Sequence, residues 1–352
     1  MNFLKDMVKG IDNANLLSEG GNSSEFSGTI DTGSYALNAL ISGSIYGGVP
    51  NNKITAFAGE SATGKTFFVL SVLKTFLDQN ENAGVIYFDT EAAVTKDMMA
   101  DRGIDVSRVV IAEPTSIEEF RTSATRILTN YIETTDKEKP KMMMVLDSLG
   151  MLSSQKELED TESGKNARDM TKAQLLRGTF RVLSLKLAKA NVPLLVTNHV
   201  YDVVGAYIPT KEISGGSGLK YAASSIVMLG KKKDKDGTEI VGNIIKATMH
   251  KSRFTKEGKK SEVKLSYDKG LDRYYGLLEL AEKYDIIKKV STRYELPDGT
   301  KVFGKNINEE PEKYFTPELL KQIDAAAAKE YKYGQHEERP VDIEETEGEE
   351  NE

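Results

Sequence analysis

Residues 59–66 form a complete P-loop, with the sequence Gly-Glu-Ser-Ala-Thr-Gly-Lys-Thr. A short apolar run, residues 53–58, comes before it, and a helical apolar pattern, residues 67–73, follows it. The sequence therefore predicts a strand, a glycine-rich turn and a helix N-terminus in succession. Such a turn directs backbone N–H groups and the positive end of the helix dipole at a phosphate. The alternative, a purely structural glycine-rich turn, does not explain this flanking context.

Each P-loop residue is a candidate nucleotide contact, namely Gly59, Glu60, Ser61, Ala62, Thr63, Gly64, Lys65 and Thr66. The two glycines allow backbone conformations and a close approach that a side chain would block. The Lys65 ammonium can reach the β and γ phosphates of a nucleotide, and the Thr66 hydroxyl can hold Mg²⁺.

The rest of the core alternates strands with helices. Near-continuous apolar runs predict five further strands, at residues 84–89, 108–111, 142–147, 193–198 and 225–229. Such runs suit strands that are covered on both faces, and helical patterns at 117–131 and 169–191 would supply the cover. We therefore expect an α/β fold, a P-loop core at residues 29–275 whose central sheet is mostly parallel and lies between helices.

Polar side chains end three of the predicted strands. Asp147 ends one that we expect beside the P-loop strand, where it would reach the Mg²⁺ hydration shell unless it caps a helix. Asp89 and Glu91 end another, and we prefer Glu91 as the base that polarises water because Asp89 is closer to the strand. His199 either makes a local hydrogen bond or senses the γ-phosphate.

Two polar segments, residues 153–166 and 200–218, leave strand ends on the same edge. The second is a long irregular loop, and long loops in compact domains are usually functional or disordered. Tyrosine stacking and backbone contacts from it would suit single-stranded nucleic acid. The candidate DNA contacts are Tyr201, Tyr207, Lys211, Gly215 and Gly216.

A basic region follows the core. Antiparallel strands are expected at 242–249 and 262–267, and lysines gather at 231–235. This region is either a solvated hairpin or a polyanion surface, and Lys251 and Arg253 are candidates for cations supplied to a nucleotide on a neighbouring copy.

The ends of the chain differ from the core. We expect an N-terminal oligomerisation element and linker at 1–28, a small α-rich appendage at 276–336 with a helix over 275–289, and a disordered tail at 337–352. The tail holds nine acids and one base, a charge of −8, so the rest of the chain carries +1 of the total of −7. The tail either aids solubility or competes with a polyanion for a basic site.

Composition restricts the remaining possibilities. The 352 residues include no cysteine, so the chain has no disulfide framework and no thiolate metal site. No apolar run is long enough to span a membrane, and the N-terminus lacks a signal-peptide pattern, so we expect a cytoplasmic protein without a membrane partner.

Together these motifs resemble the RecA family of strand-exchange ATPases, and more narrowly its phage-type members. The similarity covers roughly residues 28–290. It rests on the segments 29–34, 47–50, 59–66, 87–91, 147–148, 197–199, 215–216, 267 and 276–278.

The resemblance implies specific roles. Glu91 matches the catalytic glutamate, His199 the γ-phosphate sensor, and Lys251 with Arg253 the cations that reach ATP across a subunit interface. Tyr267 matches a tyrosine that packs on adenine. Thr95 and Met98 depart from the acid and aromatic residue that bacterial members place at the adenine.

The implied function is a DNA-dependent ATPase that uses ATP and Mg²⁺. It would form helical homo-oligomeric filaments on single-stranded DNA and exchange strands with homologous duplex DNA, together with a single-strand-binding protein and a loader. Two alternatives stay open, a hexameric helicase with the same core fold and a recombinase paralogue with little turnover.

Overall fold

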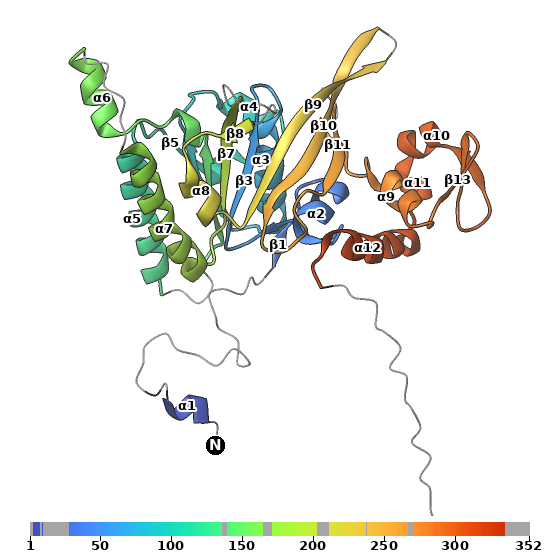
Figure 1. The fold of residues 1–352 in the computed structure, drawn as a ribbon, viewed down its shortest axis with the longest axis horizontal. Helices are drawn as coiled ribbons and strands as arrows, with labels where there is room; N and C mark the ends of the chain where they lie inside the picture. The colour runs from blue at the N-terminus through green and yellow to red at the C-terminus, as the bar shows by residue number, and fades with distance from the viewer. Residues whose placement is uncertain are drawn as a thin grey trace, which may run out of the picture.

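The computed structural model describes residues 3–7, 9, 28–135, 139–164, 171–202, 211–236, 238–266 and 270–334. One large sheet crosses the middle of the molecule, with helices on both sides and a small lobe at the C-terminal end (Figure 1). The acidic tail and most of the N-terminal element lie outside the described residues, apart from helix α1 (Phe3–Met7).

The sheet has ten strands in the order β12-β11-β10-β9-β3-β7-β6-β4-β5, with β8 paired to β7. Its parallel part is β9 (Ser225–Asp236), β3 (Ile54–Gly59), β7 (Leu194–Asp202), β6 (Met142–Asp147), β4 (Gly84–Asp89) and β5 (Val109–Ala112). The antiparallel extension is β10 (Glu239–Ser252), β11 (Lys260–Ser266) and β12 (Gly270–Leu271), and β8 is Lys211–Ile213. The predicted mostly parallel sheet is confirmed.

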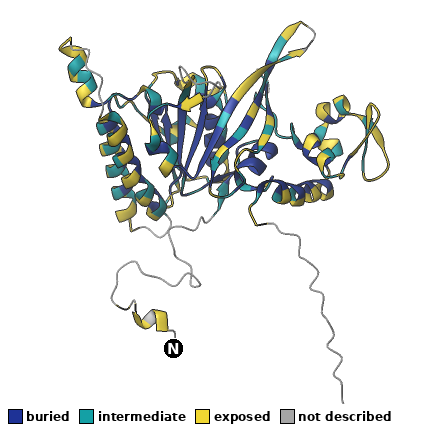
Figure 2. Cartoon of the chain, in the orientation of Figure 1, coloured by how far each residue is buried: buried dark blue, intermediate teal, exposed yellow. Residues whose placement is uncertain are grey.

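Helices bury both faces of the parallel strands. Met143 and Val145 of β6 face one hydrophobic core, and the intervening Met144 and Leu146 face the other. Figure 2 shows the buried residues concentrated in the sheet and on the inner sides of the helices. The helices packed on the sheet are α2 (Tyr35–Ser42), α3 (Lys65–Gln79), α4 (Lys96–Ala100), α5 (Ile117–Glu133), α7 (Lys172–Ala190) and α8 (Ser217–Ala222). A further helix, α6 (Gln155–Glu162), buries none of its residues and projects from the body of the molecule (Figure 1). Short strands β1 (Thr29–Ile30) and β2 (Val49–Pro50) pair with each other.

The strand order corrects one expectation. We expected the Asp147 strand beside the P-loop strand, but β7 lies between β3 and β6. Apolar runs alone do not fix which parallel strands are neighbours, because all of them are equally buried. Asp147 nevertheless reaches the P-loop helix, as described below.

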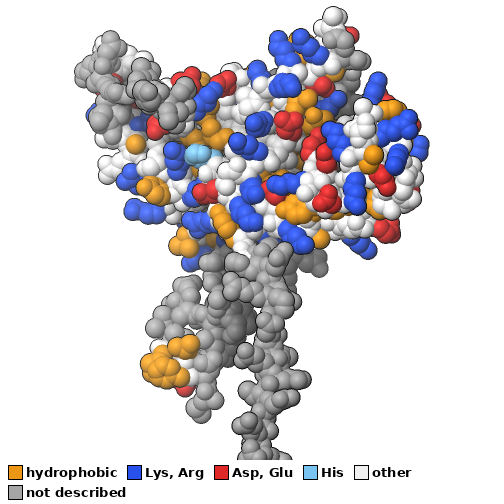
Figure 3. Space-filling model, turned by 45° about the vertical axis from the view of Figure 1, so that its right-hand side comes forward, with side chains coloured by type: hydrophobic (Ala, Val, Ile, Leu, Met, Phe, Trp, Pro, Cys, Tyr) orange, Lys and Arg blue, Asp and Glu red, His pale blue; other side chains and the backbone are white. Residues whose placement is uncertain are grey.

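The antiparallel strands expected at 242–249 and 262–267 are confirmed, and the antiparallel region extends beyond these ranges. β9 and β10 are longer than predicted and form a hairpin that projects from the body of the molecule (Figure 1). Lys231, Lys232, Lys233 and Lys235 are exposed on it. Figure 3 shows Lys and Arg side chains on this hairpin and over the C-terminal lobe.

The C-terminal lobe is not purely helical. The helix predicted over 275–289 is present but shorter, because α9 spans Leu277–Lys283 and Asp285 has a φ of 55°. A three-stranded sheet follows, made of β13 (Lys288–Val290), β14 (Arg293–Glu295) and β15 (Lys301–Phe303). The last helices are α10 (Gly304–Glu309), α11 (Pro311–Tyr314) and α12 (Pro317–Tyr331). The domain boundaries stay predictions.

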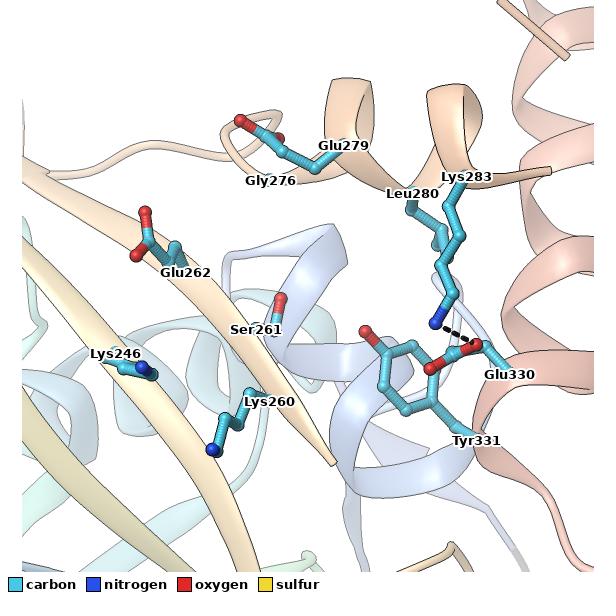
Figure 4. Close-up of a pocket in the computed structure, with 10 residues that line it drawn as sticks. All are labelled: Lys246, Lys260, Ser261, Glu262, Gly276, Glu279, Leu280, Lys283, Glu330 and Tyr331. Atoms are coloured by element: carbon cyan, nitrogen blue, oxygen red, sulfur yellow. Dashed lines mark ion pairs between the residues drawn. The ribbon is translucent and has the colours of Figure 1, made fainter. Parts of the chain in front are cut away.

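Glu330 joins the end of α12 to the core. Its carboxylate accepts from Lys259 Nζ at 2.8 Å, from Lys283 Nζ at 2.7 Å and from the Tyr284 hydroxyl at 2.9 Å. Figure 4 shows Glu330 and Lys283 side by side in the cavity between α9, α12 and the strands β10 and β11. Burial alone would raise the pKa of Glu330, but these donors outweigh it and lower the pKa to about 2.

Replacing this carboxylate should loosen the lobe. We expect Glu330→Gln to lower the free energy of unfolding by about 2 kcal/mol at pH 7, because charge-assisted hydrogen bonds are lost in a buried setting. The folded pKa of Glu330 lies below its ordinary value of 4.5, so the stabilisation is complete above pH 4.5 and disappears as the pH falls toward 2. Urea unfolding should therefore show that the difference in the free energy of unfolding between wild type and variant becomes smaller as the pH falls from 4.5 toward 2. Glu81→Gln, at an exposed turn, is the control. A deficit that does not change with pH would contradict the assignment.

Candidate nucleotide-binding site

The P-loop has the predicted geometry. β3 ends at Gly59, α3 begins at Lys65, and Gly64 precedes the helix with a φ of 86°. A Cβ on Gly59 would lie 2.6 Å from Thr63 Oγ1 and 2.7 Å from the Leu229 carbonyl oxygen, so the strand can enter the loop here only as glycine. The loop lies at the carboxyl end of the parallel strands, the edge where open α/β sheets bind ligands.

The Lys65 side chain is folded into the loop. Its ammonium donates to the carbonyl oxygens of Gly59, at 3.2 Å, and Glu60, at 2.8 Å, and the residue is buried. Burial lowers the pKa of Lys65, although the carboxylates of Glu91 and Asp147 partly offset this. The loop therefore positions the Lys65 ammonium through its own carbonyl groups.

Asp147 collects hydroxyl groups at the end of β6. Its Oδ2 accepts from Thr66 Oγ1 at 2.7 Å and from the Tyr87 hydroxyl at 2.7 Å, and its Oδ1 accepts from Thr197 Oγ1. Burial raises the pKa of Tyr87, so this phenol stays a donor. Asp147 does not cap a helix here, which removes the alternative reading of this residue.

The Thr66–Asp147 pair fits a magnesium ion. Mg²⁺ prefers oxygen ligands and is usually held by one or two protein groups together with substrate phosphates and waters. Within the described ranges, no group of three or more His, Cys, Asp or Glu is placed to hold a metal ion by itself. A metal at Thr66 would therefore depend on the nucleotide for its remaining ligands.

Glu91 and His199 meet across the end of the sheet. Glu91 Oε1 accepts from Ser148 Oγ at 2.6 Å and lies 2.9 Å from His199 Nε2. Burial alone would raise the pKa of Glu91, but the contacts with Ser148, His199 and Lys65 lower it. The carboxylate is therefore ionised at neutral pH and able to accept a proton.

Among the described residues, Asp89 makes only local hydrogen bonds. Its carboxylate accepts from the backbone N–H groups of Glu91, Ala93 and Val94 at 3.0 Å each. It shapes the turn that carries Glu91.

One cavity collects these groups. It is lined by Ser61, Ala62, Gly64, Lys65, Thr66, Phe67, Leu70, Glu91, Met98, Arg102, Asp147 and His199. Sequence reasoning missed Ser148, Thr197, Tyr87 and Arg102. Hydroxyl side chains next to Asp147 and Asn198 were a weak signal for the first two, because serine and threonine are common everywhere.

The predicted DNA contacts lie at the same edge but are only partly described. Tyr201 is exposed near the end of β7, and Lys211 in β8 pairs with the P-loop residue Glu60. Gly215 and Gly216 have positive φ just before α8. Tyr207 and Tyr267 lie outside the described residues. The DNA roles stay predictions.

Lys251 and Arg253 lie at the opposite edge of the sheet. Ser252 pairs with Ser225, which is level with Thr55 at the start of the P-loop strand. Lys251 Nζ donates to the carbonyl oxygens of Lys220, Tyr221 and Ala223 at the end of α8, and burial lowers its pKa. Arg253 is exposed. Within one copy, these two residues are therefore far from the P-loop.

Fold and site together define a P-loop nucleotide-binding protein with a RecA-type sheet. Comparison with known families agrees, since the RecA N-terminal domain family matches residues 2–272. The chain therefore belongs to the RecA family.

Individual relatives give the same result. The chain is 30% identical over 253 residues to the recombination and repair protein of Enterobacteria phage T4, a UvsX-type recombinase, covering 72% of this chain and 63% of that protein. It thus spans less than two thirds of the phage relative. It is also 30% identical over 268 residues to protein RecA of Chloroherpeton thalassium, covering 74% of this chain and 69% of that protein.

Among solved structures, the crystal structure of the RadB recombinase aligns with a TM-score of 0.49 and 22% identity, over 70% of this chain and 99% of that one. Within the part of the chain that the structure describes, no helix is both long and apolar enough to cross a membrane.

The metal assignment can be tested by binding. We expect Asp147→Asn to weaken binding of the magnesium complex of ATP by about tenfold, because the amide cannot replace the charge that orients the Thr66 hydroxyl at the metal. Calorimetric titration with ATP, once in the presence of Mg²⁺ and once in the presence of EDTA, should show the loss of affinity only in the presence of Mg²⁺. Asp298→Asn, in an exposed turn of the C-terminal lobe, is the control. An equal loss of affinity with Mg²⁺ and with EDTA would exclude a role of Asp147 at the metal.

Proposed function

We propose that this protein is an ATP-dependent DNA recombinase that forms helical filaments on single-stranded DNA and catalyses homologous pairing and strand exchange in recombination, repair and replication. The observation that carries this proposal is the separation of the P-loop from Lys251 and Arg253, which lie at opposite edges of one sheet. A cation pair that cannot serve its own nucleotide can serve the nucleotide of a neighbour. Such a contact is head-to-tail, and it gives an open helix when its rotation does not close.

Within the site, each residue has a chemical task. The P-loop N–H groups and Lys65 would hold the β and γ phosphates, and Thr66 with Asp147 would hold Mg²⁺, which neutralises phosphate charge when bound. Glu91 is ionised and would orient a water molecule and accept its proton. Lys251 and Arg253 of the adjacent copy would stabilise charge on the γ-phosphate, so that hydrolysis depends on assembly.

Contacts at the site also support coupling to DNA. His199 contacts Glu91, and its carbonyl oxygen accepts from the Ser214 backbone N–H, beside Gly215 and Gly216. Lys211 pairs with Glu60 of the P-loop. A strand of DNA at residues 200–218 would therefore compete for groups that touch the nucleotide site, and this makes the ATPase DNA-dependent.

The fold alone also accommodates a ring helicase or a regulatory paralogue. The ring helicase would also place the P-loop of one copy against Lys251 and Arg253 of the next, but its contacts would close into a ring after six copies. The paralogue is disfavoured because Glu91 is present and held by Ser148. By the same reasoning we propose as partners duplex DNA, a single-strand-binding protein and a loader, in the cytoplasm of a bacterial host if a phage encodes the chain.

Electron microscopy separates these functions. With single-stranded DNA and a slowly hydrolysed ATP analogue, the wild-type protein should form open helical filaments. Lys65→Ala should form none, because phosphate binding is lost. Glu91→Gln should form filaments with ATP itself while hydrolysis falls about 100-fold, the usual contribution of a positioned base. Closed rings, or monomers under all conditions, would overturn the proposal.

The hydrogen bond from Ser148 gives a pH prediction. Because this bond lowers the pKa of Glu91, Ser148→Ala should raise that pKa and move the acid limb of the pH profile of kcat/KM to higher pH. The alkaline limb should not move. Ser163→Ala, exposed after α6, is the control. An unshifted acid limb would show that Glu91 is not the group that titrates in catalysis.

A further inference from the structure

The nucleotide pocket has two chemically different ends. Lys65, Thr66 and Asp147 form a polar end suited to phosphates and metal. Farther along α3, Phe67 and Leu70 lie on one helix face, three residues apart, and line the same cavity together with Met98. This second end is apolar and suits the flat face of a nucleobase.

An arginine occupies the apolar end. Arg102 follows α4 and lines the cavity, with its guanidinium carbon 5.3 Å from the centroid of the Phe67 ring. Its Nη1 donates to the Met98 carbonyl oxygen at 2.7 Å. The aromatic face and the carbonyl together fix the plane of the guanidinium, so its other N–H groups have a set direction.

One donor of this guanidinium has no partner. Arg102 Nε is buried and makes no hydrogen bond, and no carboxylate pairs with Arg102 among the described residues. The carboxylates that line the pocket, Glu91 and Asp147, lie at its phosphate end. A buried charged donor without an acceptor is costly, so the hydrogen-bonding capacity of this guanidinium is not used up within the protein, and the residue lines the cavity.

The chemistry of arginine selects among bases. A guanidinium only donates hydrogen bonds. Guanine presents two adjacent acceptors, O6 and N7, whereas adenine presents the N7 acceptor next to the N6 amino group, which is itself a donor. The Thr95 hydroxyl accepts from the Met98 N–H as the cap of α4, and Thr95 is not among the residues that line this cavity.

We propose that Arg102 is a base-recognition residue, and that it extends the nucleotides this protein uses from ATP to GTP. This inference rests on the proposed function, because it takes the P-loop to hold a triphosphate. Arg102 donates to two acceptors of guanine but to only one of adenine. It therefore sets the ratio between the affinities for GTP and for ATP.

Calorimetry on the full-length protein tests this ratio with ATPγS and GTPγS in the presence of Mg²⁺. Wild-type protein should bind both within about tenfold of each other. Arg102→Met keeps the length and the packing on Phe67 but removes the donors, so GTPγS binding should weaken about tenfold or more and ATPγS binding by less than about threefold. Arg102→Lys keeps the charge without the planar fork and should lose most of the same GTPγS affinity.

Controls separate the possible failures. Arg181→Met, an exposed arginine of α7, should leave the ratio unchanged, and Lys65→Ala should weaken both nucleotides. If wild-type protein binds neither nucleotide, the proposed function fails. If it binds ATPγS but not GTPγS, or if Arg102→Met weakens both equally, base recognition is overturned and Arg102 contacts the shared ribose or phosphates. Unchanged affinities would make it only a packing residue.

Discussion

The carboxylate of Asp147 is the point on which the site is assembled. It receives hydroxyl groups from α3, β4 and β7, three elements that are distant in the sequence. These bonds fix how the P-loop helix sits relative to the strand ends that carry Glu91 and His199. Because Asp147 is buried, losing its carboxylate would take the acceptor from three hydroxyl groups and loosen the contact between the P-loop helix and the strand ends.

The sequence predicted the parts that local chemistry decides. The P-loop and the buried parallel strands follow from short patterns with a direct physical meaning, whereas the choice of Glu91 as the base stays a prediction. The order of strands does not follow from such patterns, because equally apolar strands are interchangeable locally, and so β7 between β3 and β6 was missed. The helix expected over 275–289 was placed correctly but made too long, because its pattern continued past Asp285, where the backbone turns. Arg102 was missed because a single arginine in a polar turn has no distinguishing neighbour in sequence.

The C-terminal lobe is joined to the core by ion pairs as well as by the apolar side chains that its helices bury against the core. Glu330 contacts a loop lysine, a lysine of α9 and a tyrosine, and the loop that carries the first lysine begins at Arg253. The end of α12 and the proposed interfacial cations are thus held by one short segment. Changes in the lobe can therefore reach the subunit contact without passing through the P-loop.

The placement of Lys251 and Arg253 far from their own P-loop has a consequence for any polymer of this chain. If these cations serve a neighbour's nucleotide, as proposed, one terminal copy would hold nucleotide with no neighbour to complete its site, while the other would offer cations that no nucleotide contacts. Hydrolysis would then be slowest at the first terminus, where bound triphosphate persists. Growth and loss of subunits would differ between the two termini, giving the polymer a built-in direction.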